Sequence, residues 1–115
     1  SCPTDDQRRL ARTLVDAGAD VVVGSHAHVL LGGGRLGGAY VDYGLGNFVF
    51  YAGGGPTTES GVLTLTVRGR AVTHAGWTPA RISGAVPLPL SGTDAAAATA
   101  RWGQLRACTG LAPAG

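Results

Sequence analysis

The segment Asp20-Val21-Val22-Val23-Gly24-Ser25-His26-Ala27-His28-Val29-Leu30 decides how the rest of the chain is interpreted. Its three consecutive valines are β-branched and apolar, which favours a strand covered on both faces. Gly24 then lets the chain turn. If the loop stays extended, His26 and His28 project to the same side, because side chains alternate along extended backbone. The segment therefore predicts a buried strand at 20–24 that ends in a loop bearing two imidazoles.

Two interpretations of this histidine pair stand side by side. Imidazole often serves as an ordinary hydrogen-bonding side chain, and it is also a common ligand of zinc, iron, nickel and copper. Position favours the ligand, since ligands of open α/β sheets gather beyond the carboxyl ends of strands. The third histidine, His74, falls in the middle of a predicted strand and is interpreted as a surface or structural residue.

A helix is predicted before this segment. Thr4 and Gln7 form a Thr-x-x-Gln capping box, and Gly18 supplies a C-terminal stop. Apolar residues on one face predict the stripe that packs on a sheet, and we expect it to consist of Leu10, Leu14 and Ala17, joined by Ala11 and Val15. Arginines at the remaining positions are expected to face water.

Downstream, extended segments dominate. Alternation and β-branched residues predict strands at 39–43, 47–51, 61–68 and 71–78, with a hairpin turn at 68–70. The aromatic side chains Tyr40, Tyr43, Phe48 and Phe50 are expected to pack in or around the core.

The remaining segments are predicted from their glycines, prolines and alanines. Glycine clusters at 32–34, 37–38 and 53–55 predict flexible loops. The prolines of 79–89 exclude a regular central strand there and leave room for an edge. An alanine-rich helix is expected at 95–107, capped by Thr93 or Asp94. The predicted fold is α/β, with a helix packed on a mixed, largely antiparallel sheet.

Composition bounds the function. With 115 residues the chain forms at most one domain, and 44% hydrophobic residues require a core. The net charge of +2 comes from nine arginines that are scattered along the chain, so no nucleic-acid surface is indicated. We expect no transmembrane segment, because the sequence contains no apolar run of 18 residues.

Two blocks carry a family resemblance. Gly24-Ser25-His26-Ala27-His28-Val29 and Tyr43-Gly44-Leu45-Gly46-Asn47-Phe48-Val49-Phe50, with the preceding helix, resemble the C-terminal part of the CapA family over roughly residues 3 to 80. That family is associated with capsule and poly-γ-glutamate synthesis and belongs to the calcineurin-like metallophosphatase superfamily. The resemblance implies a place in a four-layer α/β/β/α sandwich. It also implies a two-metal hydrolase site with manganese, iron or zinc, in which His26 and His28 are ligands. Gly24 and Ser25 are expected to support the loop, and Asn47 either hydrogen-bonds a ligand or steadies the loop, the second role being favoured.

The chain also departs from the family pattern. Ser25 and Ala27 stand where the family more often has histidine and proline, and the superfamily's upstream Asp-x-His, Gly-Asp and Gly-Asn-His-Asp/Glu motifs are absent. We therefore interpret residues 1–115 as the C-terminal portion of one CapA-like domain, whose partner is the N-terminal part of the same protein. The sequence leaves catalysis undecided. The alternative is a non-catalytic accessory or scaffold subunit that contacts a membrane synthase complex or an anionic polymer.

The two cysteines, Cys2 and Cys108, lie near opposite ends of the chain. Their spacing gives no zinc-ribbon or thioredoxin signal. They either form a disulfide or remain as buried thiols. The family resemblance implies an extracytoplasmic location, where disulfides persist, and so favours the disulfide.

Overall fold

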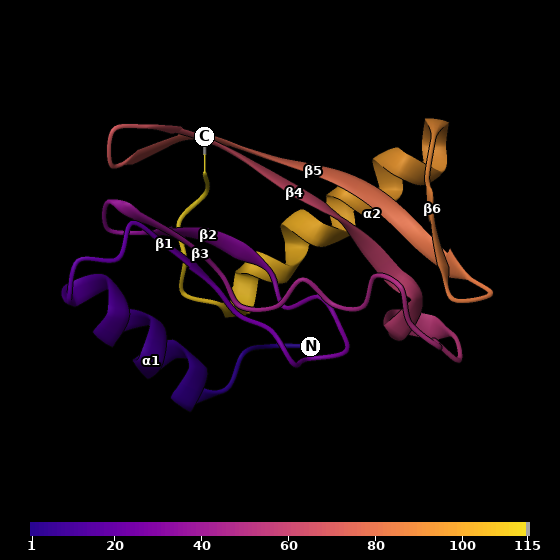
Figure 1. Cartoon of the computed structure of the whole chain (residues 1–115), viewed down its shortest axis with the longest axis horizontal. Helices are drawn as coiled ribbons and strands as arrows, with labels where there is room; N and C mark the ends of the chain where they lie inside the picture. The colour runs from indigo at the N-terminus through magenta and orange to yellow at the C-terminus, as the bar shows by residue number, and fades with distance from the viewer. Residues whose placement is uncertain (115) are drawn as a thin grey trace.

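The computed structural model describes residues 1–114 and contains two three-stranded sheets and two α-helices (Figure 1). The elements follow in the order α1 (Asp5–Asp16), β1 (Val21–Val23), β2 (Gly33–Leu36), β3 (Ala39–Asp42), the 3-10 helix η1 (Gly55–Thr58), β4 (Glu59–Arg68), β5 (Ala71–Ser83), β6 (Val86–Pro89), α2 (Gly92–Gln104) and the 3-10 helix η2 (Leu105–Cys108). The predicted α/β class is confirmed. The helix expected at 95–107 corresponds to α2 and η2 together.

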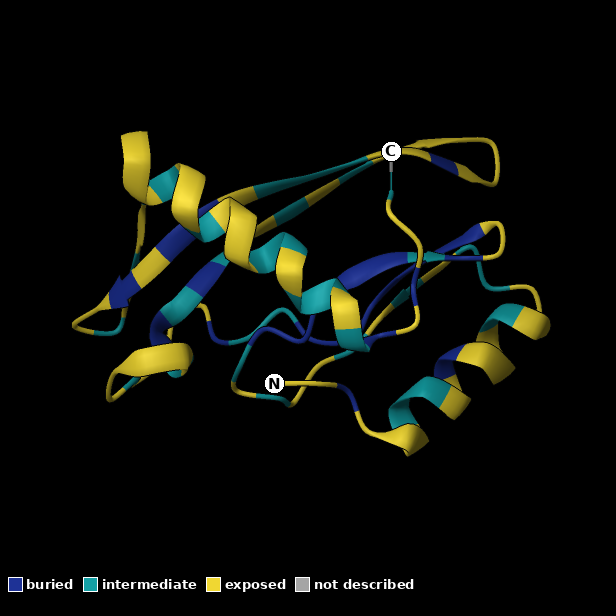
Figure 2. Cartoon of the chain, turned by 180° about the vertical axis from the view of Figure 1, so that it is seen from behind, coloured by how far each residue is buried: buried dark blue, intermediate teal, exposed yellow. Residues whose placement is uncertain are grey.

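The two sheets differ in topology. The first has the order β1-β3-β2, with β1 parallel and β2 antiparallel to β3, so it is mixed. The second has the order β4-β5-β6 and is antiparallel throughout. In Figure 1, α1 lies below the first sheet and the β4–β5 hairpin runs above it, while α2 lies along the second sheet. Figure 2 shows burial concentrated in β2, β3 and the segments around them.

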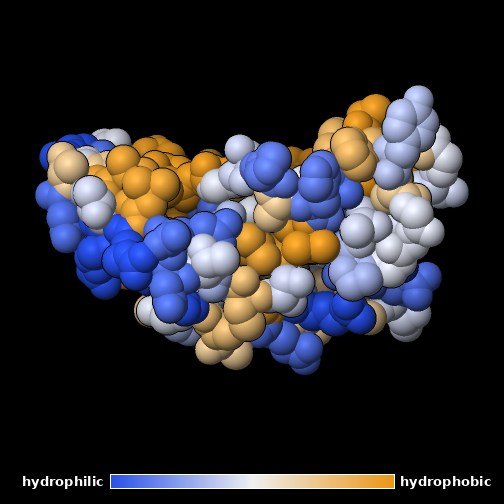
Figure 3. All heavy atoms as spheres, turned by 90° about the horizontal axis from the view of Figure 1, so that it is seen from below, coloured by the Kyte–Doolittle hydropathy of each residue, from blue (hydrophilic) through white to orange (hydrophobic). Residues whose placement is uncertain are grey.

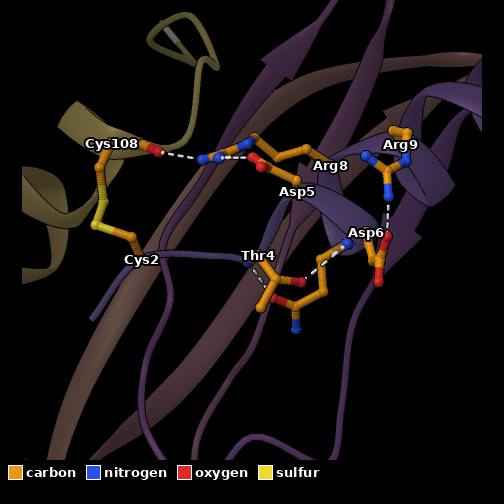
Figure 4. Close-up of polar contacts among 8 residues, drawn as sticks. Cys2, Thr4, Asp5, Asp6, Arg8, Arg9 and Cys108 are labelled. Carbon is orange, nitrogen blue, oxygen red and sulfur yellow. Dashed lines mark hydrogen bonds and ion pairs between the residues drawn. A yellow bond between two sulfur atoms is a disulfide. The ribbon is translucent and has the colours of Figure 1, made fainter.

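Helix α1 begins as the sequence predicts. The Thr4 hydroxyl accepts a hydrogen bond from the Gln7 N–H at 3.1 Å, and the Gln7 side chain accepts one from the Thr4 N–H at 2.7 Å (Figure 4). After the helix ends, Gly18 turns the chain with a φ of +109°. The capping box therefore satisfies two backbone donors that the helix itself leaves free.

Only Ala11 and Val15 of the predicted apolar stripe of α1 face the core, and the prediction is wrong for Leu10, Leu14 and Ala17, which are exposed. Leu10 is 59% exposed and Leu14 is 40% exposed, whereas Ala11 is 2% exposed and Val15 packs against the core cluster. The helix is therefore rotated so that the small Ala11 side chain contacts the sheet. Figure 3, which views the molecule from below Figure 1, shows apolar residues among the charged ones on this outer face.

The core lies between α1 and the first sheet. Its buried members come from α1, the first sheet, the segments beside that sheet and the C-terminal segment: Ala11, Leu31, Leu36, Val41, Tyr43 and Leu111. The predicted burial of Tyr43 is confirmed, and so is that of Tyr40 on the opposite face of β3. The C-terminal segment joins the outer edge of β2 through paired backbone hydrogen bonds between Arg35 and Ala112.

The prediction of a flexible loop at 32–34 is wrong, because part of that segment is strand β2. A Cβ on Gly33 would lie 2.7 Å from Asp42 Oδ2, and a Cβ on Gly34 would lie 2.4 Å from the Ala112 carbonyl oxygen. Neither distance is compatible with a side chain. These glycines therefore permit close packing on both faces of the strand, a use that composition cannot distinguish from a flexible loop.

The prediction that the valine strand is covered on both faces is also wrong. Within residues 1–114, β1 pairs with β3 alone and forms an edge of its sheet. Val21 is 37% exposed and Val23 is 48% exposed, while Val22 packs against the core. The apolar run reflects one covered face and one uncovered face.

Segment 47–51 is not a strand. It has no partner strand among the described residues, because the chain turns at Gly46 with a φ of +70° and then runs over the surface. Phe48 and Phe50, expected in or around the core, are 50% and 43% exposed. Its first residue, Asn47, is buried and bonds through its side chain instead.

The C-terminal half departs from prediction in two details. Strand β5 continues through Pro79 to Ser83, and β6 forms the edge beside it. The proline is tolerated there although β5 is the central strand of its sheet, which corrects the expectation for 79–89. Helix α2 has Ser91 as its N-cap residue rather than Thr93 or Asp94, and no side chain caps it.

A disulfide joins Cys2 to Cys108, with the two Cα atoms 5.8 Å apart (Figure 4). It links the segment before α1 to η2, and the Arg8 guanidinium donates a hydrogen bond to the Cys108 carbonyl oxygen at 2.9 Å beside it. None of the helices in residues 1–114 is long and apolar enough to cross a membrane.

Candidate metal-binding site

The two histidines of the segment that follows β1 lie close together at the surface. Their ring centroids are 6.2 Å apart with the ring planes tilted by 53°. His26 adopts a φ of +77°, a left-handed conformation that is uncommon for a residue with a Cβ and that concentrates at functional sites. The loop therefore holds the two imidazole rings beside one another at the surface.

Asn47 fixes the protonation pattern of His28. Its Nδ2 donates hydrogen bonds to the carbonyl oxygens of Thr57 at 3.0 Å and of His28 at 3.3 Å. Because an amide nitrogen has no acceptor capacity and must face those carbonyls, Oδ1 is the amide atom that faces the ring, 2.7 Å from Nδ1. The neutral imidazole of His28 therefore carries its proton on Nδ1, and in that form the Nε2 lone pair is free.

The support for Asn47 is itself buried. Asn47 is 7% exposed, and its carbonyl oxygen accepts a hydrogen bond from the Ser60 hydroxyl at 2.6 Å, while Ser60 is 2% exposed. The side-chain amide of Asn47 is thus held by the backbone of η1, and its main-chain carbonyl by the start of β4. Such outer partners of a histidine set its orientation and tautomer in metal sites.

An exposed apolar loop borders the pair. The Phe50 ring lies with its centroid 4.8 Å from that of His28. Its neighbours Val49 and Tyr51 are 73% and 91% exposed. This loop places aromatic surface beside the imidazole.

The predicted supporting residues have different roles. Gly24 is required sterically, because a Cβ there would lie 2.2 Å from the Tyr43 carbonyl oxygen. Ser25 is exposed and makes no side-chain hydrogen bond in the described part of the chain. Of the predicted loop support, Asn47 alone contacts a histidine through its side chain.

Other titratable groups lie elsewhere. His74 is exposed on β5 and pairs in register with Thr66. Glu59 forms an ion pair with Arg101 of α2.

No group of three or more histidine, cysteine, aspartate or glutamate residues suited to a metal ion occurs within residues 1–114. The histidine pair fits a metal ion, because imidazole is a common ligand and Nε2 of neutral His28 is free to bind. It supplies two ligands, whereas a catalytic zinc site usually takes three from the protein.

Sequence reasoning missed Asp42, which is fully buried at the end of β3 and accepts a hydrogen bond from the Gly24 N–H through its main-chain carbonyl oxygen. Its signal was a carboxylate in an otherwise apolar strand, two residues before the Gly44-Leu45-Gly46 block. Burial raises its pKa from an ordinary 3.8 to about 6, although the hydrogen bond from the Gly44 N–H acts to lower it.

The fold and the loop define an α/β protein with a preorganised histidine pair, and comparisons with known proteins identify its relatives. The family described as "Bacterial capsule synthesis protein PGA_cap" matches residues 1–52. The chain is 40% identical over 88 residues to the PGA biosynthesis protein CapA of Bacillus subtilis and 35% identical over 89 residues to the capsule biosynthesis protein CapA of Bacillus anthracis. The chain belongs to the CapA family of capsule-synthesis proteins.

The extent of these matches is uneven. They cover 76% and 77% of this chain but 23% and 22% of the two relatives. The chain thus spans less than a quarter of the length of the curated relatives it matches. No solved structure matches it significantly.

Proposed function

We propose that this chain is the C-terminal portion of a CapA-like domain in which His26 and His28 contribute two ligands to a two-metal, calcineurin-like hydrolase site. Family membership supports a role in capsule or PGA biosynthesis. In this proposal the remaining ligands come from the N-terminal part of the same protein, which completes the four-layer sandwich. The protein acts outside the cytoplasm, which the Cys2–Cys108 disulfide supports.

The observation that carries the proposal is the tautomer of His28. Asn47 holds the proton on Nδ1, so Nε2 presents a lone pair without any rearrangement. Asn47 is itself anchored by two hydrogen bonds from its side-chain Nδ2 and by one from the Ser60 hydroxyl to its main-chain carbonyl oxygen, which is more support than a surface histidine needs. His26 adopts a left-handed backbone conformation, and Ala27 alone separates it from His28 along the chain. Its ring lies beside that of His28.

The pair acts as a ligand set in this proposal and not as an acid or a base. When bound, two divalent ions would activate water and offset the charge that develops on a phosphoryl group. The contribution of this chain is to hold two imidazoles before the metal arrives. Manganese, iron and zinc all accept imidazole nitrogen, so this donor set does not discriminate among them.

A second function is favoured by one observation. The exposed aromatic segment Phe48–Tyr51 presents apolar surface beside the site, as an accessory or scaffold subunit that contacts a membrane synthase complex or a polymer would. The two proposals differ in the metal ligands that they require outside residues 1–115, in a protein as long as the relatives. An intact acidic and histidine set favours the hydrolase, and its loss favours the scaffold.

Metal binding by this chain is tested with Mn²⁺ in solution NMR, because paramagnetic broadening detects even weak binding. We expect the ring signals of His26 and His28 to broaden at a lower Mn²⁺ concentration than those of His74. In the His28→Ala variant the broadening of His26 should require several-fold more Mn²⁺, whereas the matched His74→Ala variant should behave as the wild type. Equal broadening of all three histidines would contradict the proposed ligand pair.

A further inference from the structure

The turn Asp42-Tyr43-Gly44 holds both ends of the histidine loop. At the start of the loop, the Gly24 N–H donates a hydrogen bond to the Asp42 carbonyl oxygen at 2.7 Å. At its end, the Leu31 N–H donates to the Gly44 carbonyl oxygen at 3.0 Å. The separation of these two carbonyls therefore sets the span of the loop that carries the histidines.

The Asp42 side chain fixes that separation. Its Oδ1 accepts a hydrogen bond from the Gly44 N–H at 3.0 Å, which closes the turn from the inside. An aspartate that bonds the backbone two residues on is a standard way to hold a turn. Asp42 is 0% exposed, so water does not compete for this bond.

Close packing leaves the loop little freedom to shift relative to the turn. The absent Cβ of Gly24 would lie 2.2 Å from the Tyr43 carbonyl oxygen, so the two backbones are in direct contact. On the far side of the turn, the chain continues within a few residues to Asn47, which bonds the ring of His28. One turn thus governs both the histidine loop and the residue that sets the His28 tautomer.

We propose that Asp42 is a positioning residue that holds the histidine loop and Asn47 in register, so that His28 Nε2 is presented in one direction. This inference rests on the proposed function where it treats Nε2 as a metal ligand. The restraint itself follows from the hydrogen bonds of the turn. Asp42 touches neither histidine, and it acts through the backbone of Gly24 and Gly44.

The surroundings of Asp42 supply a conservative variant. Its Oδ2 and the Tyr40 hydroxyl both lack a hydrogen-bond partner among residues 1–114, and both lie against Gly33. In Asp42→Asn, Oδ1 can still accept from the Gly44 N–H while the charge of the side chain is removed. Asp42→Ala removes the acceptor altogether. The pair of variants therefore separates the hydrogen bond from the charge.

The test uses long-range ¹H–¹⁵N NMR of the histidine rings without any metal. In the wild type and in Asp42→Asn we expect His28 to be almost entirely the Nδ1–H tautomer. In Asp42→Ala we expect the mixture of tautomers that an unrestrained histidine shows. Val72→Ala is the matched control, because Val72 is also buried, at 2% exposure, but belongs to β5 and not to the turn. It should lose stability while the His28 tautomer stays unchanged.

A second measurement on the wild type covers the case in which Asp42→Ala does not fold. The Gly24 and Gly44 amides should exchange with solvent more slowly than those of the exposed segment 53–55, by at least about tenfold. Exchange at the same rate, or an unchanged tautomer in folded Asp42→Ala, would overturn the positioning role. If Mn²⁺ failed to bind while the tautomer depended on Asp42, the proposed function would fail and the positioning role would stand.

Discussion

Replacement of Asp42 by asparagine should stabilise the protein at neutral pH and have little effect in acid. Burial raises the pKa of Asp42 in the folded protein to about 6, from an ordinary value of 3.8. The carboxyl group is 0% exposed and receives one hydrogen bond, from the Gly44 N–H. The folded state therefore disfavours the ionised form of this group.

The sign of the effect follows from proton binding. Below about pH 3.8 the carboxyl is protonated in both states and imposes no penalty. Between about pH 3.8 and 6 the unfolded chain loses its proton while the folded protein keeps it, so stability falls as pH rises. A difference of about two pKa units corresponds to about 3 kcal/mol above pH 6. Asparagine cannot ionise and avoids this loss.

Urea unfolding followed by tryptophan fluorescence measures the effect, since Trp77 and Trp102 stack with ring centroids 5.0 Å apart and should separate on unfolding. The difference in unfolding free energy between Asp42→Asn and the wild type should grow by about 2 kcal/mol from about pH 4 to pH 7, because the carboxyl of the unfolded chain is already partly ionised at pH 4. The control Val72→Ala changes a buried side chain that carries no ionisable group and should give a difference nearly independent of pH. A flat difference for Asp42→Asn would refute the burial penalty.

Three further predictions follow from the fold and the site. Cys2 and Cys108 should resist alkylation until they are reduced, and loss of their bond should cost up to about 4.7 kcal/mol of stability in the chain-entropy model. Two thiols that react without reduction would refute the disulfide. Gly24→Ala places a Cβ 2.2 Å from a backbone carbonyl oxygen and should cost about 1–3 kcal/mol in urea unfolding, whereas Gly53→Ala, with no atom near its Cβ, should cost much less; equal costs would contradict the close approach. The chain alone should show no manganese-dependent hydrolysis of an aryl phosphate, because within residues 1–114 the ligand set is incomplete; turnover abolished by His28→Ala would contradict this.

Local patterns in the sequence were sufficient for several elements. The capping box of Thr4 and Gln7, the turn at 68–70 and the long hairpin on either side of it all depend on neighbouring residues. The α/β class follows from the same patterns. The position of the histidine pair directly after a strand could also be predicted, because both features lie within one segment of eleven residues.

The remaining features depended on contacts between distant segments. The glycines of 33–34 look like a loop in sequence, yet they form a strand because Asp42 and Ala112 pack against their Cα atoms. Segment 47–51 looks like a strand, yet it has no partner strand among the described residues and lies exposed. Strand propensity cannot decide either case, since a strand is stabilised by its neighbours.

The site shows the same division. The sequence by itself determined that two imidazoles follow a strand, because spacing and side-chain alternation are local properties. Only the tertiary structure decided which nitrogen of His28 is free, since Asn47 lies 19 residues away and reaches the ring through a turn at Gly46. The tertiary structure also decided that Asp42 is buried, because its burial depends on the segments that pack against β3.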